Sequence, residues 1–211
     1  MTHLYLLNRI SVLSLIASVL DLVFAIDGSD SLLPEQFEHL KQLAKNMIDL
    51  YSISEKATHV GVLEYSDKAV VEIKLNDFYK SWELKQAIDR IKSSNKKGVV
   101  TDEVLRKAAD KIFNSENGAR PGAAKVLVIL TDDKSTGEEP LGQAVVPLND
   151  KGVRIYVVSI GPNTDQDEIK TIVAGDKNII STKTTYEVPP LAPVLKKQIE
   201  DDIDDRKLHL Q

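Results

Sequence analysis

Two groups of oxygen-bearing side chains are the strongest candidates for chemistry in this sequence. Asp27 is followed at alternate positions by Ser29 and Ser31, and Asp132 lies in a second polar group much further along the chain. Alternate residues of an extended turn point the same way, so Asp27, Ser29 and Ser31 are expected to share one side. Gly28 between them is expected to permit a tight turn.

Carboxylates and hydroxyls are the hard oxygen ligands that suit Mg²⁺ or Mn²⁺. A Ca²⁺ site usually takes more carboxylates, so Ca²⁺ is the less favoured ion. The sequence therefore predicts a divalent-metal site built on Asp27, Ser29, Ser31 and Asp132. The alternative is that Ser29, Ser31 and Asp132 are ordinary helix caps and turn residues.

The remaining composition excludes several other kinds of site. Cysteine is absent, which excludes disulfides, thiolate zinc sites and cysteine nucleophiles. The four histidines are scattered, without a helical metal-ligand spacing, and are expected to be solvated or at the edges of the fold. The 27 basic and 32 acidic residues give a net charge of −5 without a strong basic run, so nucleic-acid binding is not predicted. Neither a phosphate-binding P-loop nor a dinucleotide glycine pattern is present.

The candidate residues follow strongly apolar segments. Residues 20–26 and 124–130 are almost entirely apolar and predict strands buried on both faces, and residues 153–160 predict a third. Asp27 and Asp132 come just after the first two of these segments. Ligands of such sheets bind at the carboxyl ends of the strands, near a switch in strand order, which is where both carboxylates are expected.

The rest of the chain alternates between strand and helix patterns. A short connection between residues 59–65 and 69–75 predicts an antiparallel hairpin, and residues 179–182 predict a last strand. Apolar residues at three- and four-residue spacing predict helices over 34–51, 82–91, 101–113, 141–149, 165–173 and 191–203. The predicted fold is α/β, with a mostly parallel central sheet, one antiparallel edge strand and helices on both faces.

The two ends of the chain are expected to lie outside the domain. The apolar run after Arg9 is too short to span a bilayer, so residues 1–19 are not predicted to be a transmembrane helix. They are interpreted either as a secretory signal peptide or as an extension of the first strand. Residues 20–203 are predicted to form the domain and 204–211 a polar tail. The acidic cluster at 201–205 is expected to be a frayed, solvated helix end. No Asn-x-Ser/Thr glycosylation site occurs.

Four segments of the chain, in this order, resemble the von Willebrand factor type A (vWA) domain family. Residues 23–31 (VFAIDGSDS) resemble its Asp-x-Ser-x-Ser signature, residues 60–66 (VGVLEYS) and 153–161 (VRIYVVSIG) two of its strands, and residues 127–133 (LVILTDD) its strand ending in Thr-Asp-Gly. The sequences of these segments most resemble those of extracellular matrix members, such as the A domains of type VI collagen and other secreted animal adhesion proteins. The resemblance covers about residues 20–203 and implies a Rossmann-like fold.

The resemblance also implies a metal-ion-dependent adhesion site, MIDAS. Asp27, Ser29, Ser31 and Asp132 match its ligands, and a threonine from another loop completes it in the family. If Leu105 aligns with the family's small-Leu pair, Thr101 takes the second threonine position and Val99 replaces the ligand. If the loop is reshaped, Thr101 could still reach the metal, and the other interpretation of Thr101 is a helix N-cap.

A second departure from the family pattern is Asp133, which stands where glycine is usual. Its negative charge would strengthen cation binding but repel an acidic ligand.

The function that follows from the resemblance is binding, not catalysis. We expect a secreted, extracellular matrix domain that binds a matrix or cell-surface protein, with collagen as a candidate, by coordinating an acidic residue of the partner. Two alternatives are an intracellular vWA assembly module and a vWA domain that binds partners through a metal-independent surface. A phosphohydrolase is a remote alternative, because Ser29 stands where such an enzyme needs a second aspartate.

Overall fold

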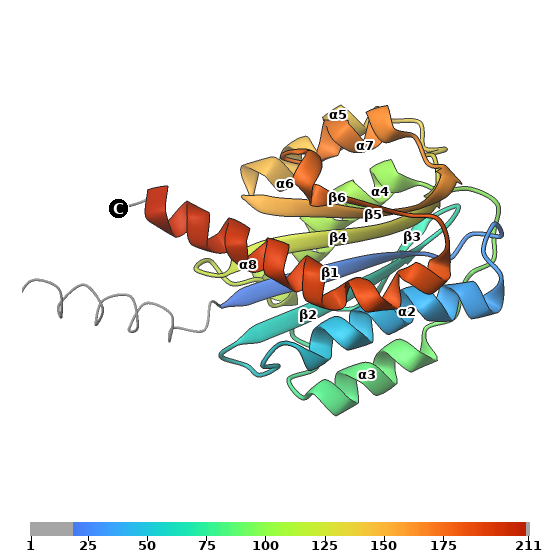
Figure 1. Cartoon of the computed structure of the whole chain (residues 1–211). Coiled ribbons are helices and arrows are strands. Elements are labelled where there is room, and N and C mark those ends of the chain that lie inside the picture. The colour runs from blue at the N-terminus through green and yellow to red at the C-terminus, as the bar shows by residue number, and fades with distance from the viewer. Residues whose placement is uncertain (1–18, 210–211) are drawn as a thin grey trace, which may run out of the picture.

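A computed structural model describes residues 19–209 as one α/β unit around a six-stranded sheet (Figure 1). The strands lie in the order β3-β2-β1-β4-β5-β6, and every neighbouring pair is parallel except β2 and β3. Their bounds are β1 Leu20–Asp27, β2 Thr58–Tyr65, β3 Ala69–Ile73, β4 Ala124–Asp133, β5 Val153–Asn163 and β6 Ile179–Thr182. The predicted fold class and the antiparallel edge strand are confirmed.

Helices cover both faces of this sheet (Figure 1). One face carries α2 Pro34–Asp49, α3 Ser81–Arg90 and α8 Ala192–His209. The other carries α4 Thr101–Lys107, α5 Leu141–Ala144, α6 Val146–Asp150 and α7 Gln166–Ile172. Within the part of the chain that the structure describes, none of the helices is long and apolar enough to cross a membrane.

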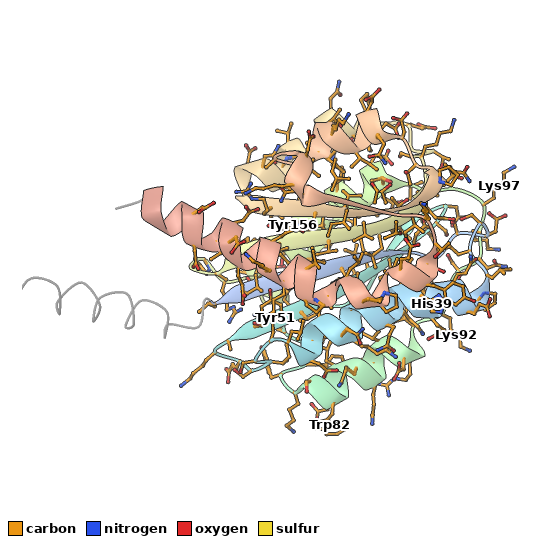
Figure 2. All side chains as sticks on the ribbon, in the orientation of Figure 1. His39, Tyr51, Trp82, Lys92, Lys97 and Tyr156 are labelled. Atoms are coloured by element: carbon orange, nitrogen blue, oxygen red, sulfur yellow. The ribbon has the colours of Figure 1, made fainter. Side chains whose placement is uncertain are left out.

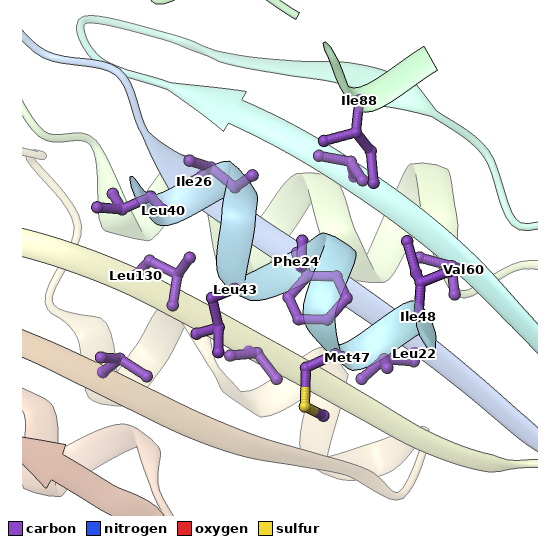
Figure 3. Packing of buried hydrophobic residues seen from close by; sticks show 14 of the residues in the cluster. Leu22, Phe24, Ile26, Leu40, Leu43, Met47, Ile48, Val60, Ile88 and Leu130 are labelled. Atoms are coloured by element: carbon purple, nitrogen blue, oxygen red, sulfur yellow. The ribbon is translucent and has the colours of Figure 1, made fainter. Parts of the chain in front are cut away.

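The alternation of side chains along β1 feeds two separate cores. Leu22, Phe24 and Ile26 face α2, where they meet Leu40, Leu43 and Met47 (Figure 3). Val23 and Ala25 face the opposite way and pack with residues of α4 and α5. All of these β1 side chains have no exposed surface, so the strand that ends at Asp27 is held on both faces and gives that residue a fixed position.

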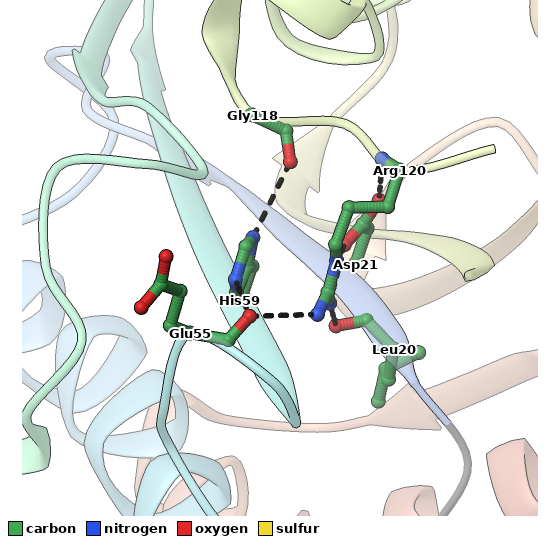
Figure 4. Close-up of polar contacts among 6 residues, drawn as sticks. All are labelled: Leu20, Asp21, Glu55, His59, Gly118 and Arg120. Carbon is green, nitrogen blue, oxygen red and sulfur yellow. Dashed lines mark hydrogen bonds and ion pairs between the residues drawn. The ribbon is translucent and has the colours of Figure 1, made fainter. Parts of the chain in front are cut away.

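A polar network closes the amino-terminal edge of the sheet (Figure 4). The buried Asp21 accepts hydrogen bonds from the Arg120 guanidinium at 2.7 and 2.9 Å and from the Arg120 backbone N–H at 2.8 Å. His59 is also buried, with one ring nitrogen 3.0 Å from the carbonyl oxygen of Glu55 and the other 3.3 Å from that of Gly118. His59 lies at an edge of the sheet as expected, but it is buried and bridges two loops, so the expectation of a solvated side chain is wrong.

Two of the predicted helices are interrupted. The helix expected over 101–113 changes after Lys107 into a π-helical turn, Ala108–Ile112. The helix expected over 141–149 is split into α5 and α6, because Pro147 has no N–H to continue the ladder to the carbonyl of Gln143.

The acidic cluster near the carboxyl end is not a frayed helix end. α8 continues to His209, and Asp202 on it is buried, accepting hydrogen bonds from the Tyr156 hydroxyl at 2.6 Å and the Asn178 amide at 3.2 Å. Lys177 forms an ion pair with the same carboxylate. Burial raises the pKa of Asp202, but these hydrogen bonds outweigh it and hold that pKa below its ordinary value. Asp202 therefore joins the last helix to β5 and to the turn before β6.

Candidate metal site

The site lies where the order of strands switches. β1 is the central strand, with β2 on one side and β4 on the other, and Ile26 is in register with Leu130. The carboxyl ends of β1 and β4 therefore meet at one edge of the sheet, on the right in Figure 1, and bring Asp27 next to the Thr131–Asp132 segment. This is the position at which open α/β sheets bind ligands.

Four of the five predicted site residues are joined by hydrogen bonds. Ser29 Oγ lies 2.8 Å from Ser31 Oγ, which in turn donates to Asp132 Oδ1 at 2.9 Å. Asp27 Oδ1 accepts from the Ser29 backbone N–H at 3.0 Å, and Asp27 Oδ2 accepts from Thr131 Oγ1 at 3.3 Å. The cluster runs from the fully buried Asp27 to the exposed Ser31, so its outer oxygens can be reached from solvent.

Of the alternative of helix caps and turn residues, the structure contradicts the caps, while the serines do lie in a turn in which the Leu32 N–H donates to the Ser29 carbonyl at 3.4 Å. The N-cap residue of α2 is Leu33, whose backbone N–H donates a hydrogen bond to Gln36 Oε1 at 2.8 Å. Neither Ser29 nor Ser31 caps this helix. Their hydroxyls instead face each other and Asp132.

Both carboxylates of the cluster have a pKa above the ordinary value of an aspartate. Burial raises the pKa of Asp27 from 3.8 to about 7, and the charge of Asp132 adds to the rise, against hydrogen bonds from Ser29 and Thr131 that lower it. Burial also raises the pKa of Asp132, with the charge of Asp133 acting in the same direction. Within residues 19–209, none of the three aspartates forms an ion pair with a lysine or arginine. Within the described part of the chain, none of these three carboxylates is therefore neutralised by a direct ion pair.

A buried glutamate under the site holds the neighbouring loop, and the sequence reading did not single it out. Glu64 Oε1 accepts from the Ser94 N–H at 3.0 Å and from the Ser94 hydroxyl at 2.7 Å. Ser93 Oγ donates to the Gly28 carbonyl at 2.7 Å, which fixes the 93–97 loop against the Asp27–Ser31 turn. In the sequence, this role is indicated only by the presence of a carboxylate within a mostly apolar strand.

Gly28 is required for a different reason from the one expected. Its φ is not in the left-handed region, so the turn itself does not demand glycine. A Cβ built at Gly28 would lie 2.0 Å from Glu64 Oε1. The missing side chain thus makes room for the glutamate that anchors the loop.

Thr101, the fifth predicted residue, stands apart from the four. It is the first residue of α4, whose N-cap is Val100 without a side-chain cap, so the N-cap interpretation is wrong. Its side chain is nearly buried and lines a small depression with Thr131 and Asp133. Val99 is buried too, and its N–H donates to Thr136 Oγ1 at 2.8 Å. Thr101 therefore shares this depression with chain neighbours of the cluster and forms no hydrogen bond with its four residues.

Comparison with known proteins agrees with this fold. Residues 21–196 match the von Willebrand factor type A domain. The chain is 35% identical to matrilin-1 of Gallus gallus over 157 residues, which are 74% of this chain and 31% of that protein. It is 33% identical to the collagen alpha-4(VI) chain of Mus musculus over 151 residues, 71% of this chain and 6% of that one. The chain thus spans less than a third of the length of these relatives.

Solved structures show the same fold. Proximal thread matrix protein 1 from the mussel byssus superposes with a TM-score of 0.81 at 20% identity, over 84% of this chain and 47% of that one. Another structure of that protein, with the same TM-score of 0.81, has a zinc-occupied MIDAS motif. With the strand order, the Asp-x-Ser-x-Ser turn and the matched range together, the chain belongs to the von Willebrand factor type A domain family.

Proposed function

We propose that this domain binds an extracellular matrix protein through a divalent cation held by Asp27, Ser29, Ser31 and Asp132. The observation that carries the proposal is the chain of oxygens from Ser29 Oγ through Ser31 Oγ to Asp132 Oδ1, beside a buried carboxylate whose pKa is raised. A bound cation would remove the repulsion between the two carboxylates. The donor set therefore fits a metal ion.

The residues fit a hard, small ion best. Two hydroxyls and two carboxylates offer oxygen only, which suits Mg²⁺ or Mn²⁺ more than a Ca²⁺ cage, and the mussel protein shows that such a motif can also hold zinc. When bound, the cation would supply an open coordination position for a carboxylate of the partner. Thr101 is kept as a candidate fifth ligand, although a change in the 98–100 loop would be needed to bring it to the others.

The chain's own residues do the positioning. Asp27 is fixed by the two-sided packing of β1, and its Oδ1 orders the turn by accepting from the Ser29 N–H. Glu64 and Ser94 hold the 93–97 loop against that turn. A preordered ligand set of this kind loses little entropy on binding an ion, which favours affinity.

The matrix setting is supported by the relatives. Matrilins and type VI collagen chains are matrix proteins, and neither name denotes an enzyme. We therefore propose a secreted, non-enzymatic binding domain, with collagen among the candidate partners. Recovery of the chain from culture medium, with the sequence at its new amino terminus determined, tests secretion and the signal-peptide interpretation of residues 1–19. Retention inside the cell would favour the alternative of an intracellular assembly module.

Calorimetric titration of the full chain with Mg²⁺ and Mn²⁺ tests the metal site. We expect one site in the wild type and at least about a tenfold loss of affinity in Ser29→Ala, because ligand-shell changes cost that much. Ser115→Ala, at an exposed serine in the turn Ser115–Asn117, is the matched control. If neither ion binds, the metal-independent surface becomes the preferred mode of binding.

A further inference from the structure

Four lysines surround the candidate metal site at the same edge of the sheet. Lys92, Lys96 and Lys97 lie in the segment between α3 and α4, and Lys134 directly follows β4. All four are exposed, and Figure 2 labels Lys92 and Lys97 at the end of the molecule to which β1 runs. Among residues 19–209, none of these four ammonium groups has a carboxylate within ion-pair distance.

Backbone hydrogen bonds tie two of these lysines to the site. The Lys96 carbonyl accepts from the Asp30 N–H at 3.1 Å, and Lys96 forms a β-bridge with Ser29. The Lys134 N–H donates to Asp133 Oδ1 at 2.8 Å. The two lysines thus belong to two different loops beside the oxygen cluster.

The charges of the three loops that form the site balance without a cation. Segments 27–33, 92–100 and 131–136 carry four aspartates and four lysines. A bound divalent ion would therefore leave this edge with two positive charges in excess. The nearby segments 66–68 and 183–187 are each neutral, whereas Asp165 and the carboxylates of Glu64 and Glu168 lie against these loops, so the positive excess belongs to the three loops themselves.

We infer that the partner of this edge is an acidic protein segment in which the metal-coordinating carboxylate is flanked by further carboxylates, which pair with Lys96, Lys97 and Lys134. This inference rests on the proposed metal-dependent function. A metal-coordinated carboxylate fixes the segment over Ser31, and the flanking acidic side chains then face the unpaired lysines on either side. Specificity for acidic neighbours would come from the lysines, and dependence on the cation from the oxygen cluster.

Fluorescence anisotropy with two labelled peptides of equal length tests this inference on the full chain. One peptide has a single central glutamate among glycines and serines, and the other has that glutamate flanked by two further glutamates on each side. Each exposed ion pair changes an affinity by roughly 1.5- to 5-fold, so we expect the acidic peptide to bind about tenfold more tightly in Mg²⁺. The variant Lys96→Gln/Lys97→Gln should reduce that advantage by several-fold. The exposed pair Lys56→Gln/Lys111→Gln, towards the other edge of the sheet, should leave it unchanged.

The outcomes separate this inference from the proposed function. Equal Mg²⁺-dependent binding of both peptides would overturn the role of the lysines and leave the metal site intact. Absence of Mg²⁺ binding, with neither peptide bound, would overturn both. If a heparin fragment binds through Lys96 and Lys97 in EDTA more tightly than the acidic peptide binds in Mg²⁺, the edge is a site for a sulfated polysaccharide and the acidic-segment inference is wrong.

Discussion

Replacement of Asp27 by asparagine should stabilise the metal-free domain at neutral pH. Asp27 is fully buried, and burial together with Asp132 raises its pKa from 3.8 to about 7. The folded state therefore binds the Asp27 proton more tightly than the unfolded state does. Ionised Asp27 therefore destabilises the folded state by an amount set by this difference in pKa. The free energy of unfolding falls as the pH rises from 3.8 to about 7.

The magnitude follows from the pKa. A rise of roughly three pH units, at about 1.4 kcal/mol each, makes the ionised group cost about 4 kcal/mol above pH 7 and almost nothing below pH 4. An asparagine can accept from the Ser29 N–H as Asp27 does, and its amide N–H can donate to Thr131 Oγ1. We therefore expect Asp27→Asn to be more stable than the wild type by about 2–4 kcal/mol at pH 8, with the difference vanishing towards pH 4.

Urea unfolding of both proteins in EDTA, across this pH range, measures the difference directly. Carboxylates remote from Asp27 titrate equally in the two proteins, so their contributions cancel, and only Asp132, which interacts with Asp27, adds a change of its own. Parallel stability curves for wild type and Asp27→Asn would refute the reasoning. Added Mg²⁺ at a hundred times its Kd should remove most of this difference, because it stabilises the wild type by about 2.7 kcal/mol and the variant has lost a charged ligand.

Two further changes test the supports of the site and of the last helix. Gly28→Ala places a Cβ 2.0 Å from Glu64 Oε1, so it should cost about 1–3 kcal/mol in urea unfolding and weaken Mg²⁺ binding, whereas Gly122→Ala, which meets nothing within 4 Å, should change neither. Asp202→Asn should cost about 1.5–3 kcal/mol in the same assay, because a buried charged acceptor loses its bonds, while the exposed Asp201→Asn should be nearly neutral.

The strands and the order of the elements could be predicted because their information is local. The apolar runs at 20–26, 124–130 and 153–160 are each long enough for a strand buried on both faces, and helices separate most of them. The three-residue connection at 66–68 similarly fixed the antiparallel hairpin. The expected helix boundaries were less accurate where a proline or a π-helical turn interrupted an otherwise regular apolar pattern.

Buried polar residues were read wrongly because their partners are remote in sequence. Asp202 lies in a run of acidic residues on a helix of low amphipathicity, and its partner Tyr156 is in β5. His59 likewise acquires its role from a loop around Gly118. A single charged or polar residue in such a position looks solvated until the tertiary fold supplies a hydrogen-bond partner.

The oxygen that completes the metal site is the clearest case of information that local sequence does not hold. The turn from Asp27 to Ser31 is one short segment, so spacing alone places its oxygens on one side, and the strand pairing adds Asp132. The third loop is different, because its position depends on bonds to other loops. Val99 exchanges backbone and side-chain hydrogen bonds with Thr136, and the Val100 N–H donates to the Ser66 carbonyl.

These bonds set where α4 begins, and therefore where Thr101 stands. The apolar Val99 side chain packs into the core on the α4 side, a place that a ligating hydroxyl could not occupy without losing that contact. Reaching the cation with Thr101 would require the loop to give up part of its pairing with Thr136. For the metal site that we propose, the packing of this loop therefore favours Asp27, Ser29, Ser31 and Asp132 as the protein ligands, without Thr101.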